Sequence, residues 1–137
     1  MDLVNTKTTI IKDNPSASFV GSWSTGTSAP GHYGSNYRFH LTGTANEPAI
    51  WSAILPDSGN WTVYVWYSQG SNRSTSAPYT ISTASGNVTK HVNQQANGGK
   101  WVSQGTYNMN AWLNTISLSP VAPAGYVVIA DAVKWAK

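Results

Sequence analysis

The sequence contains no cysteine and few charged residues. The lack of cysteine excludes disulfides, thiol nucleophiles and cysteine-ligated metal sites. Charged residues make up only 9% of the 137 positions, against roughly 25% in typical soluble domains. Ser, Thr, Asn and Gly take their place, so hydroxyl and amide groups solvate the surface. Such a surface is common in extracellular bacterial modules and rare in cytosolic enzymes.

The chain also lacks a basic cluster and a long apolar run. Its formal net charge is +3, but the eight Lys and Arg are scattered, so nucleic acid is not an expected partner. An acidic polysaccharide remains compatible, because a few well-placed cations would suffice. No stretch reaches the length of a membrane span. Met1 to Ile10 shows no basic-then-apolar signal peptide.

Carboxylates are too few to point to an active site. The acids are Asp2, Asp13, Glu47, Asp57 and Asp131. Glycoside hydrolysis commonly needs two facing carboxylates. Three of the acids are terminal or lie in or beside turns, and no spacing argument brings the remaining pair, Glu47 and Asp131, together.

Other catalytic patterns are equally weak. The sequence has no Gly-x-Ser-x-Gly motif. His32, His40 and His91 are far apart and fit polar surface positions, so we expect no metal site. Tyr37 and Arg38 could serve a lyase as base and neutraliser, but so could many other pairs. We therefore expect neither enzymatic activity nor a cofactor.

The sequence is rich in two amphipathic aromatic residues. Seven Trp and seven Tyr stand against two Phe. A core can be filled with Phe as readily as with Trp, whereas Trp and Tyr suit half-buried positions where a polar edge is available. We therefore expect some of these rings at the surface.

Apolar residues recur with a period of two rather than 3.6, which predicts strands. The expected strands, bounded by Gly, Pro, Asn and Asp turns, are Thr8 to Lys12, Asn36 to Leu41, Ala49 to Ile54, Trp61 to Tyr67, Tyr79 to Thr83, Val88 to Val92, Trp101 to Tyr107, Asn114 to Leu118 and Tyr126 to Trp135. This pattern favours an all-β fold: one antiparallel, jelly-roll-like β-sandwich of about 8–10 strands spanning residues 1–137.

The strand from Trp61 to Tyr67 assigns its residues to two faces. Trp61, Val63, Val65 and Tyr67 point one way and read as core. Tyr64 and Trp66 point the other way, about 7 Å apart between Cα atoms, a spacing that suits stacking on sugar rings. Alternatively, the two rings lie under a covering loop.

Asp131 stands within an apolar run, where an unpaired carboxylate would be expensive to bury. We expect a cationic partner, and Arg38 and Arg73 are the only two arginines. The pair either ties the last strand to the body or orients an arginine toward a ligand.

Several blocks together resemble the golvesin C-terminal-like domain, also described as the carbohydrate-binding-like domain of xanthan lyases. The blocks are Gly21 to Ser24, Tyr33 to Arg38, Val63 to Ile81, Gln94 to Val102, Gly105 to Tyr107 and Tyr126 to Val133. They run in order from about Ile10 to Trp135, which makes the resemblance specific. One segment departs from the family pattern, Asn108 to Leu113, where Trp112 is either an added ligand contact or a core filler.

The resemblance implies a non-catalytic β-sandwich module appended to a large secreted bacterial enzyme. We therefore interpret Met1 as the start of a segment taken from a longer extracellular protein. The expected partners are a polysaccharide and an attached catalytic domain, and we expect a monomer.

Six residues are candidate ligand contacts besides Tyr64. Arg73 can bind hydroxyl pairs or a carboxylate with two prongs. Asn72 and Gln95 either bind hydroxyls or close turns, and Trp101 either stacks on a sugar or caps the core. The full set is Arg73, Trp66, Tyr64, Trp101, Asn72, Gln95 and Arg38. They support two hypotheses: a carbohydrate-binding module, or a structural spacer, surface-attachment or protein-interaction domain without sugar binding.

Overall fold

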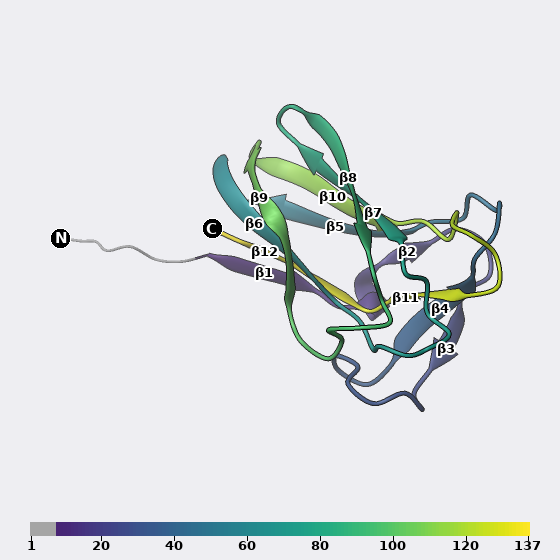
Figure 1. Ribbon diagram of the computed structural model, residues 1–137. Coiled ribbons are helices and arrows are strands. Elements are labelled where there is room, and N and C mark those ends of the chain that lie inside the picture. Colours follow the sequence, from purple (N-terminus) through teal and green to yellow (C-terminus); the bar gives the residue numbers. More distant parts are fainter. Residues whose placement is uncertain (1–7) are drawn as a thin grey trace.

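The computed structural model describes residues 8–137, so Met1 and Asp2 lie outside the described residues. Twelve strands and one short 3-10 helix, η1 (Asn14–Ser16), make up the regular structure of this part (Figure 1). The strands are β1 (Thr9–Lys12), β2 (Ser18–Phe19), β3 (Ser24–Gly26), β4 (Tyr37–Leu41), β5 (Ala49–Leu55), β6 (Gly59–Trp66), β7 (Ala77–Thr83), β8 (Gly86–Val92), β9 (Val102–Met109), β10 (Trp112–Leu118), β11 (Val127–Ala130) and β12 (Ala132–Ala136). Residues 8–137 hold no helix long and apolar enough to cross a membrane.

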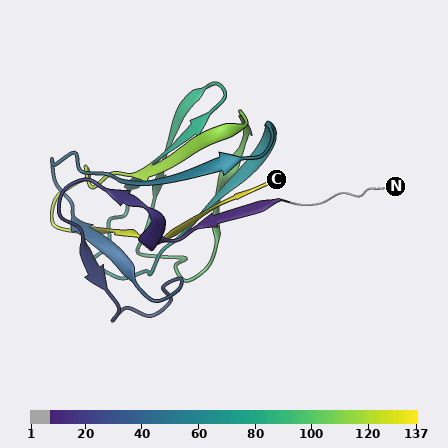
Figure 2. The ribbon, with the colours of Figure 1, turned by 180° about the vertical axis from the view of Figure 1, so that it is seen from behind.

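The strands form three antiparallel sheets. One sheet has the order β1-β12-β6-β9, a second has the order β2-β5-β10-β7-β8, and a third, smaller sheet has the order β11-β4-β3. Figure 2 shows from behind that β3 and β4 lie at the end of the molecule away from the C-terminus. The expected antiparallel, jelly-roll-like β-sandwich is confirmed.

The core lies between the inward faces of the two large sheets. β5 and β6 each bury alternate residues, as a half-buried strand should. The predicted core face of β6 is confirmed, since Trp61, Val63, Val65 and Tyr67 are at most 1% exposed. Trp51 of β5 stacks on Tyr79 of β7 with ring centroids 6.4 Å apart, a contact that links the two strands on either side of β10.

The main differences from the sequence-based prediction concern the chain ends. The single strand expected over Tyr126 to Trp135 is two strands that meet end to end at Asp131, where the chain leaves β4 and joins β1 and β6. The short strands β2 and β3 were not predicted, because two or three residues are too few to show a period of two.

A buried glutamine holds β11 to the body of the sandwich. Gln94 is 0% exposed, and its Nε2 donates to Ile129 O at 3.0 Å while its Oε1 accepts from Ile129 N at 2.8 Å. The same Nε2 lies 3.0 Å from the hydroxyl of Tyr79. Burial is the main cause that raises the pKa of the Tyr79 phenol far above its usual value, so this hydroxyl stays neutral.

The first and last described residues lie next to each other. β1 pairs with β12 along its full length, and Lys137 N donates to Thr8 O at 2.9 Å. The Lys137 ammonium also lies 2.9 Å from Asp57 Oδ1. Figure 1 shows this end on the left, opposite the small sheet.

We expect Gln94→Ala to lower the free energy of unfolding by about 3 kcal/mol, because it leaves the N–H of Ile129 buried without this partner and its C=O with only the 3.5 Å contact from the Tyr79 hydroxyl. Urea denaturation measures this. Gln95→Ala is the matched control: its amide also donates to two carbonyls, but it is partly exposed and water can replace it. Equal losses in the two variants would contradict the assignment.

Candidate functional site

A pocket of about 480 Å³ lies over the small sheet. Its floor and walls are aromatic, aliphatic, hydroxyl, amide and guanidinium groups, from Thr25, Gly26, Thr27, Ser28, Ala29, Tyr37, Phe39, Asn72, Arg73, Val127 and Ile129. Its volume falls in the usual range of small-molecule sites. Two of the predicted ligand contacts, Asn72 and Arg73, come together here.

The alternation of β4 decides which of its side chains reach the pocket. Tyr37 and Phe39 line it, with ring centroids 6.1 Å apart. Arg38 lies on the other face of the strand, where its guanidinium sits 4.8 Å above the ring of Phe19. Arg38 is therefore not at this site, and Tyr37 and Arg38 cannot act as one catalytic pair.

Arg73 is held from below by neutral groups. Its Nε donates to Ser68 O at 3.1 Å and its Nη2 to Ser68 Oγ at 3.2 Å, while Nη1 donates to Asn72 Oδ1. The residue is only 8% exposed. Gly70 lies directly against the guanidinium, and a Cβ there would come within 3.1 Å of it. These contacts fix the plane of the guanidinium at the edge of the pocket.

The loop that carries Asn72 and Arg73 runs along β11. Val127 N donates to Asn72 O at 2.9 Å, and Ser74 N donates to Val127 O at 2.8 Å. Gln95 Nε2 donates to Ser71 O and Arg73 O, at 3.2 and 2.9 Å. Gln95 closes the loop, one of the two roles that the sequence left open, and it does not line the pocket.

Two of the three rings expected to stack on sugars, Trp66 and Trp101, form a half-buried cluster with Tyr33. Trp66, Trp101 and Tyr33 pack mutually, with centroids 5.2 to 5.4 Å apart. Trp66 Nε1 donates to Gly31 O at 2.8 Å, so the loop over Trp66 is the same segment that supplies Thr27, Ser28 and Ala29 to the pocket. Of the two alternatives that the sequence left open for Trp66, the ring lies under a covering loop.

Tyr64 extends this cluster along β6, and a lysine lies on it. Lys134 of β12 stands opposite Tyr64 in the sheet. Its ammonium lies 4.3 Å from the Tyr64 ring centroid and 4.6 Å from that of Trp101, within cation–π range. The faces that a sugar would need on these two rings are therefore shared with a cation.

The ion pair expected for Asp131 is wrong. Within residues 8–137 no salt bridge joins this carboxylate to either arginine; its oxygens accept from Tyr33 N at 2.8 Å and from Asn14 Nδ2 at 3.3 Å. Its pKa is raised to about 8, mainly by burial and partly by charge repulsion from the neighbouring Asp13. The carboxyl group avoids an unpaired buried charge by holding a proton rather than by binding a cation.

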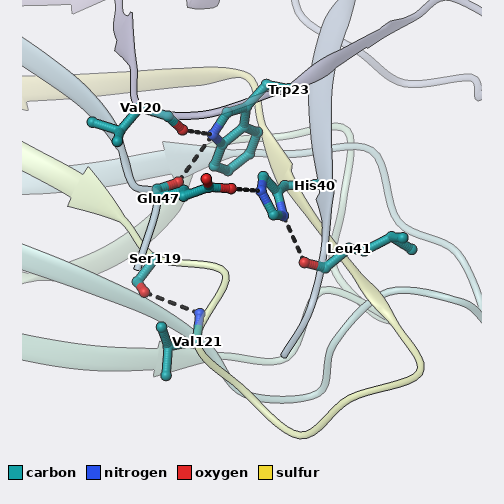
Figure 3. A network of polar contacts seen from close by, with 7 residues as sticks. All are labelled: Val20, Trp23, His40, Leu41, Glu47, Ser119 and Val121. Carbon is teal, nitrogen blue, oxygen red and sulfur yellow. Dashed lines mark hydrogen bonds and ion pairs between the residues drawn. The ribbon is translucent and has the colours of Figure 1, made fainter. Parts of the chain in front are cut away.

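The opposite face of β4 carries a separate polar network (Figure 3). His40 Nε2 lies 2.7 Å from Glu47 Oε1, and its Nδ1 lies 2.6 Å from Leu41 O. Trp23 packs edge-on against the His40 ring and donates Nε1 to Glu47 O. Among residues 8–137, no three His, Asp or Glu gather into a group that could hold a metal ion.

Trp112 lies far from the pocket, at the turn between β9 and β10. Its side chain is 73% exposed, so it is not a core filler. Its φ of +80° is rare for a side-chain-bearing residue. Leu113 and Ile54, paired across β10 and β5, are also exposed beside it. Of the other Trp residues, three are half-buried and three are fully buried. Trp112 and the half-buried rings confirm the expectation that some aromatic rings lie at the surface.

Sequence reasoning missed the aromatic floor of the pocket and its hydroxyl-bearing wall. Tyr37 and Phe39 alternate within a predicted strand, and that alternation was the available signal. Thr25, Thr27 and Ser28 carry no such signal, because a Ser/Thr-rich stretch looks like any loop. Only the fold brings this stretch opposite Asn72 and Arg73.

Comparison with known proteins gives a consistent picture. The Golvesin C-terminal domain family matches residues 9–137. A xanthan lyase of Bacillus sp. (strain GL1) is 33% identical over 134 residues, covering 92% of this chain and 14% of the lyase. A Paenibacillus xanthan lyase structure matches with a TM-score of 0.88 at 34% identity, over 95% of this chain and 13% of that one.

A smaller protein shares the fold over nearly its whole length. A family 35 carbohydrate-binding module from Clostridium thermocellum matches with a TM-score of 0.68 at 20% identity, covering 93% of this chain and 97% of the module. At this identity the match shows the fold alone. The chain spans only about an eighth of the lyases that it matches.

We expect the stability of the protein to fall as pH rises from about 4 to about 8. The native state keeps Asp131 protonated up to its raised pKa of about 8, whereas the unfolded chain loses that proton near 3.8. The stabilisation is therefore complete below the lower value and lost through the upper one. Asp131→Asn should flatten this dependence in thermal melts at pH 5 and pH 8, whereas the exposed control Asp57→Asn should not. An unchanged slope in Asp131→Asn would refute the assignment.

Proposed function

Because the chain belongs to the golvesin C-terminal domain family, we propose that it is a non-catalytic carbohydrate-binding module, normally part of a secreted bacterial polysaccharide-active enzyme. Its relatives at 33 and 34% identity are xanthan lyases, of which it covers a small part. A module with the same fold is a family 35 carbohydrate-binding module. These similarities support a role in which this chain binds a polysaccharide while a separate domain of the same enzyme carries out catalysis.

The pocket over the small sheet is the proposed sugar site. The observation that carries this assignment is its mixed lining, because Tyr37 and Phe39 offer apolar ring surface below a rim of hydroxyl, amide and guanidinium groups. A sugar presents the complementary pattern, with C–H faces for the rings and hydroxyls for the rim. Asn72 is exposed and can bond hydroxyls, while Arg73 is held in a fixed orientation.

The lining also supports a binding role over a catalytic one. It contains neither a carboxylate nor an imidazole. Glu47 pairs with His40 on the far face of β4, and Asp131 is fully buried. General acid–base catalysis most often uses such groups. The Tyr37 hydroxyl, which could also act as a base, accepts from Ala29 N at 3.3 Å, and Tyr37 is 4% exposed.

Binding of this kind raises the local concentration of an attached enzyme on its polymer. The pocket is small, so we expect a Kd on the order of micromolar to millimolar. Attachment converts this weak contact into an effectively intramolecular one and keeps the enzyme near its substrate. The proposal includes an extracellular location and a monomeric module.

The test is affinity electrophoresis against a polysaccharide panel of xanthan, other acidic gums, cellulose, chitin, α-glucans and peptidoglycan. We expect retardation by at least one polymer, and loss of that retardation in Asn72→Ala and Phe39→Ala with thermal stability checked in parallel. Trp112→Ala is the matched control, because it removes an exposed aromatic ring at the other end of the sandwich. It should migrate like the parent.

Each other outcome points elsewhere. Retardation lost only in Trp112→Ala would move the sugar site to the turn between β9 and β10. Retardation by no polymer would overturn the module assignment in favour of a structural spacer, surface-attachment or protein-interaction domain. The exposed apolar residues Trp112, Leu113 and Ile54 would then be the first surface to examine for a protein partner.

We further expect Trp66→Phe to weaken binding several-fold without removing any pocket residue. The ring remains, but the hydrogen bond to Gly31 O is lost, so the loop that supplies Thr27 and Ser28 is held less firmly. Trp23→Phe is the control, because it makes the same chemical change on the opposite face of β4. Titration with the retarding polymer compares the two variants; equal binding of Trp66→Phe and parent would exclude this supporting role.

A further inference from the structure

Arg73 is a buried cation whose contacts within residues 8–137 are all neutral. It is 8% exposed, and its hydrogen bonds go to Ser68 O, Ser68 Oγ and Asn72 Oδ1. The ion pairs of the described residues join His40 to Glu47 and Lys137 to Asp57, so neither reaches it. A guanidinium cannot escape burial by losing its proton, because its pKa exceeds about 12. A charge in this position is stabilised by an anion.

An anion that pairs with Arg73 could reach its guanidinium from the pocket. A guanidinium has about five N–H donors, and the three hydrogen bonds above leave about two of them free. The group lines a pocket of about 480 Å³ that contains no acidic residue. The apolar floor of Tyr37, Phe39 and Ile129 lowers the local dielectric and strengthens any charge–charge contact above it.

On the basis of the function proposed above, we propose that this pocket selects saccharides that carry a carboxylate, with Arg73 as the counter-charge. The free N–H groups of a guanidinium match the two oxygens of a carboxylate, which gives stronger and more directional bonds than neutral hydroxyls do. Asn72 and the hydroxyls of Thr25 and Thr27 then bind the sugar ring that bears the acid. The carboxylate could belong to a uronic acid or to a pyruvyl ketal.

The first experiment uses the unmodified protein and two forms of one polymer. Polygalacturonate is compared with the same polymer after its carboxyl groups have been reduced to hydroxymethyl groups. A pyruvylated gum is compared with the same gum after acid removal of the ketal, which separates the two carboxylate sources. We expect at least roughly tenfold weaker retardation by the carboxyl-free member of one of these pairs, and a steep loss of binding with added salt.

Variants assign the effect to Arg73. Arg73→Met should lose this preference for the acidic form, while Arg73→Lys should keep part of it because a point charge remains. Lys90→Met is the matched control, since it removes one positive charge from an exposed position on β8. Thermal melts establish that each variant is folded before binding is compared, and the unmodified protein answers the main question if Arg73→Met does not fold.

The outcomes separate this inference from the function on which it rests. Equal retardation by acidic and carboxyl-free polymers overturns the selection for carboxylates and leaves a carbohydrate-binding module. Retardation by neither form of either polymer also overturns the selection for carboxylates, and the full polysaccharide panel then decides separately whether the carbohydrate-binding function stands. A preference for the acidic form that persists in folded Arg73→Met, or that Lys90→Met also loses, removes Arg73 from the site.

Discussion

The two-sided hydrogen bond between Gln94 and Ile129 is the contact on which the pocket end of this molecule depends. Among residues 8–137, β11 has β4 on one edge and no regular strand along the other. The side-chain amide of Gln94 takes the place of a strand residue there, offering one acceptor and one donor to one backbone unit. The loop through Arg73 continues the same edge through Val127. The floor of the pocket and the loop that carries Arg73 are therefore both held by backbone groups along this edge of β11.

The aromatic cluster and the pocket then form one mechanical unit. Trp66 and Trp101 are half-buried, and their packing on Tyr33 fixes the segment that walls the pocket. The close approach of Gly31 to Gly99 holds the same segment, because a Cβ at Gly31, whose φ is +83°, would lie 3.3 Å from Gly99 Cα. Rings that suggest a stacking platform in sequence can thus act as supports in three dimensions, since aromatic rings pack on one another as readily as on sugars.

The sequence predicted the structure best where a local pattern of residues is compatible with only one arrangement. The alternation of β6 predicted its core face, and the family blocks placed Asn72 and Arg73 in a loop that does line the pocket. The ion pair of Asp131 failed because its partners are a backbone N–H and an amide 98 and 117 residues away, donors that no charge pattern can indicate. The segment from Thr25 to Ala29 could not be predicted as a pocket wall for the same reason. It lines the pocket only because the fold brings it opposite Asn72 and Arg73.

The pairing of β1 with β12 has a practical consequence. Because Lys137 N bonds to Thr8 O, a short connection could join these two positions without moving either strand. New ends could open at the exposed tip between β7 and β8, around Ser85 and Gly86, which contacts neither the pocket nor the aromatic cluster. The molecule is thus suited to circular permutation, and a host protein fused there would hold the pocket in a different orientation toward a polymer surface.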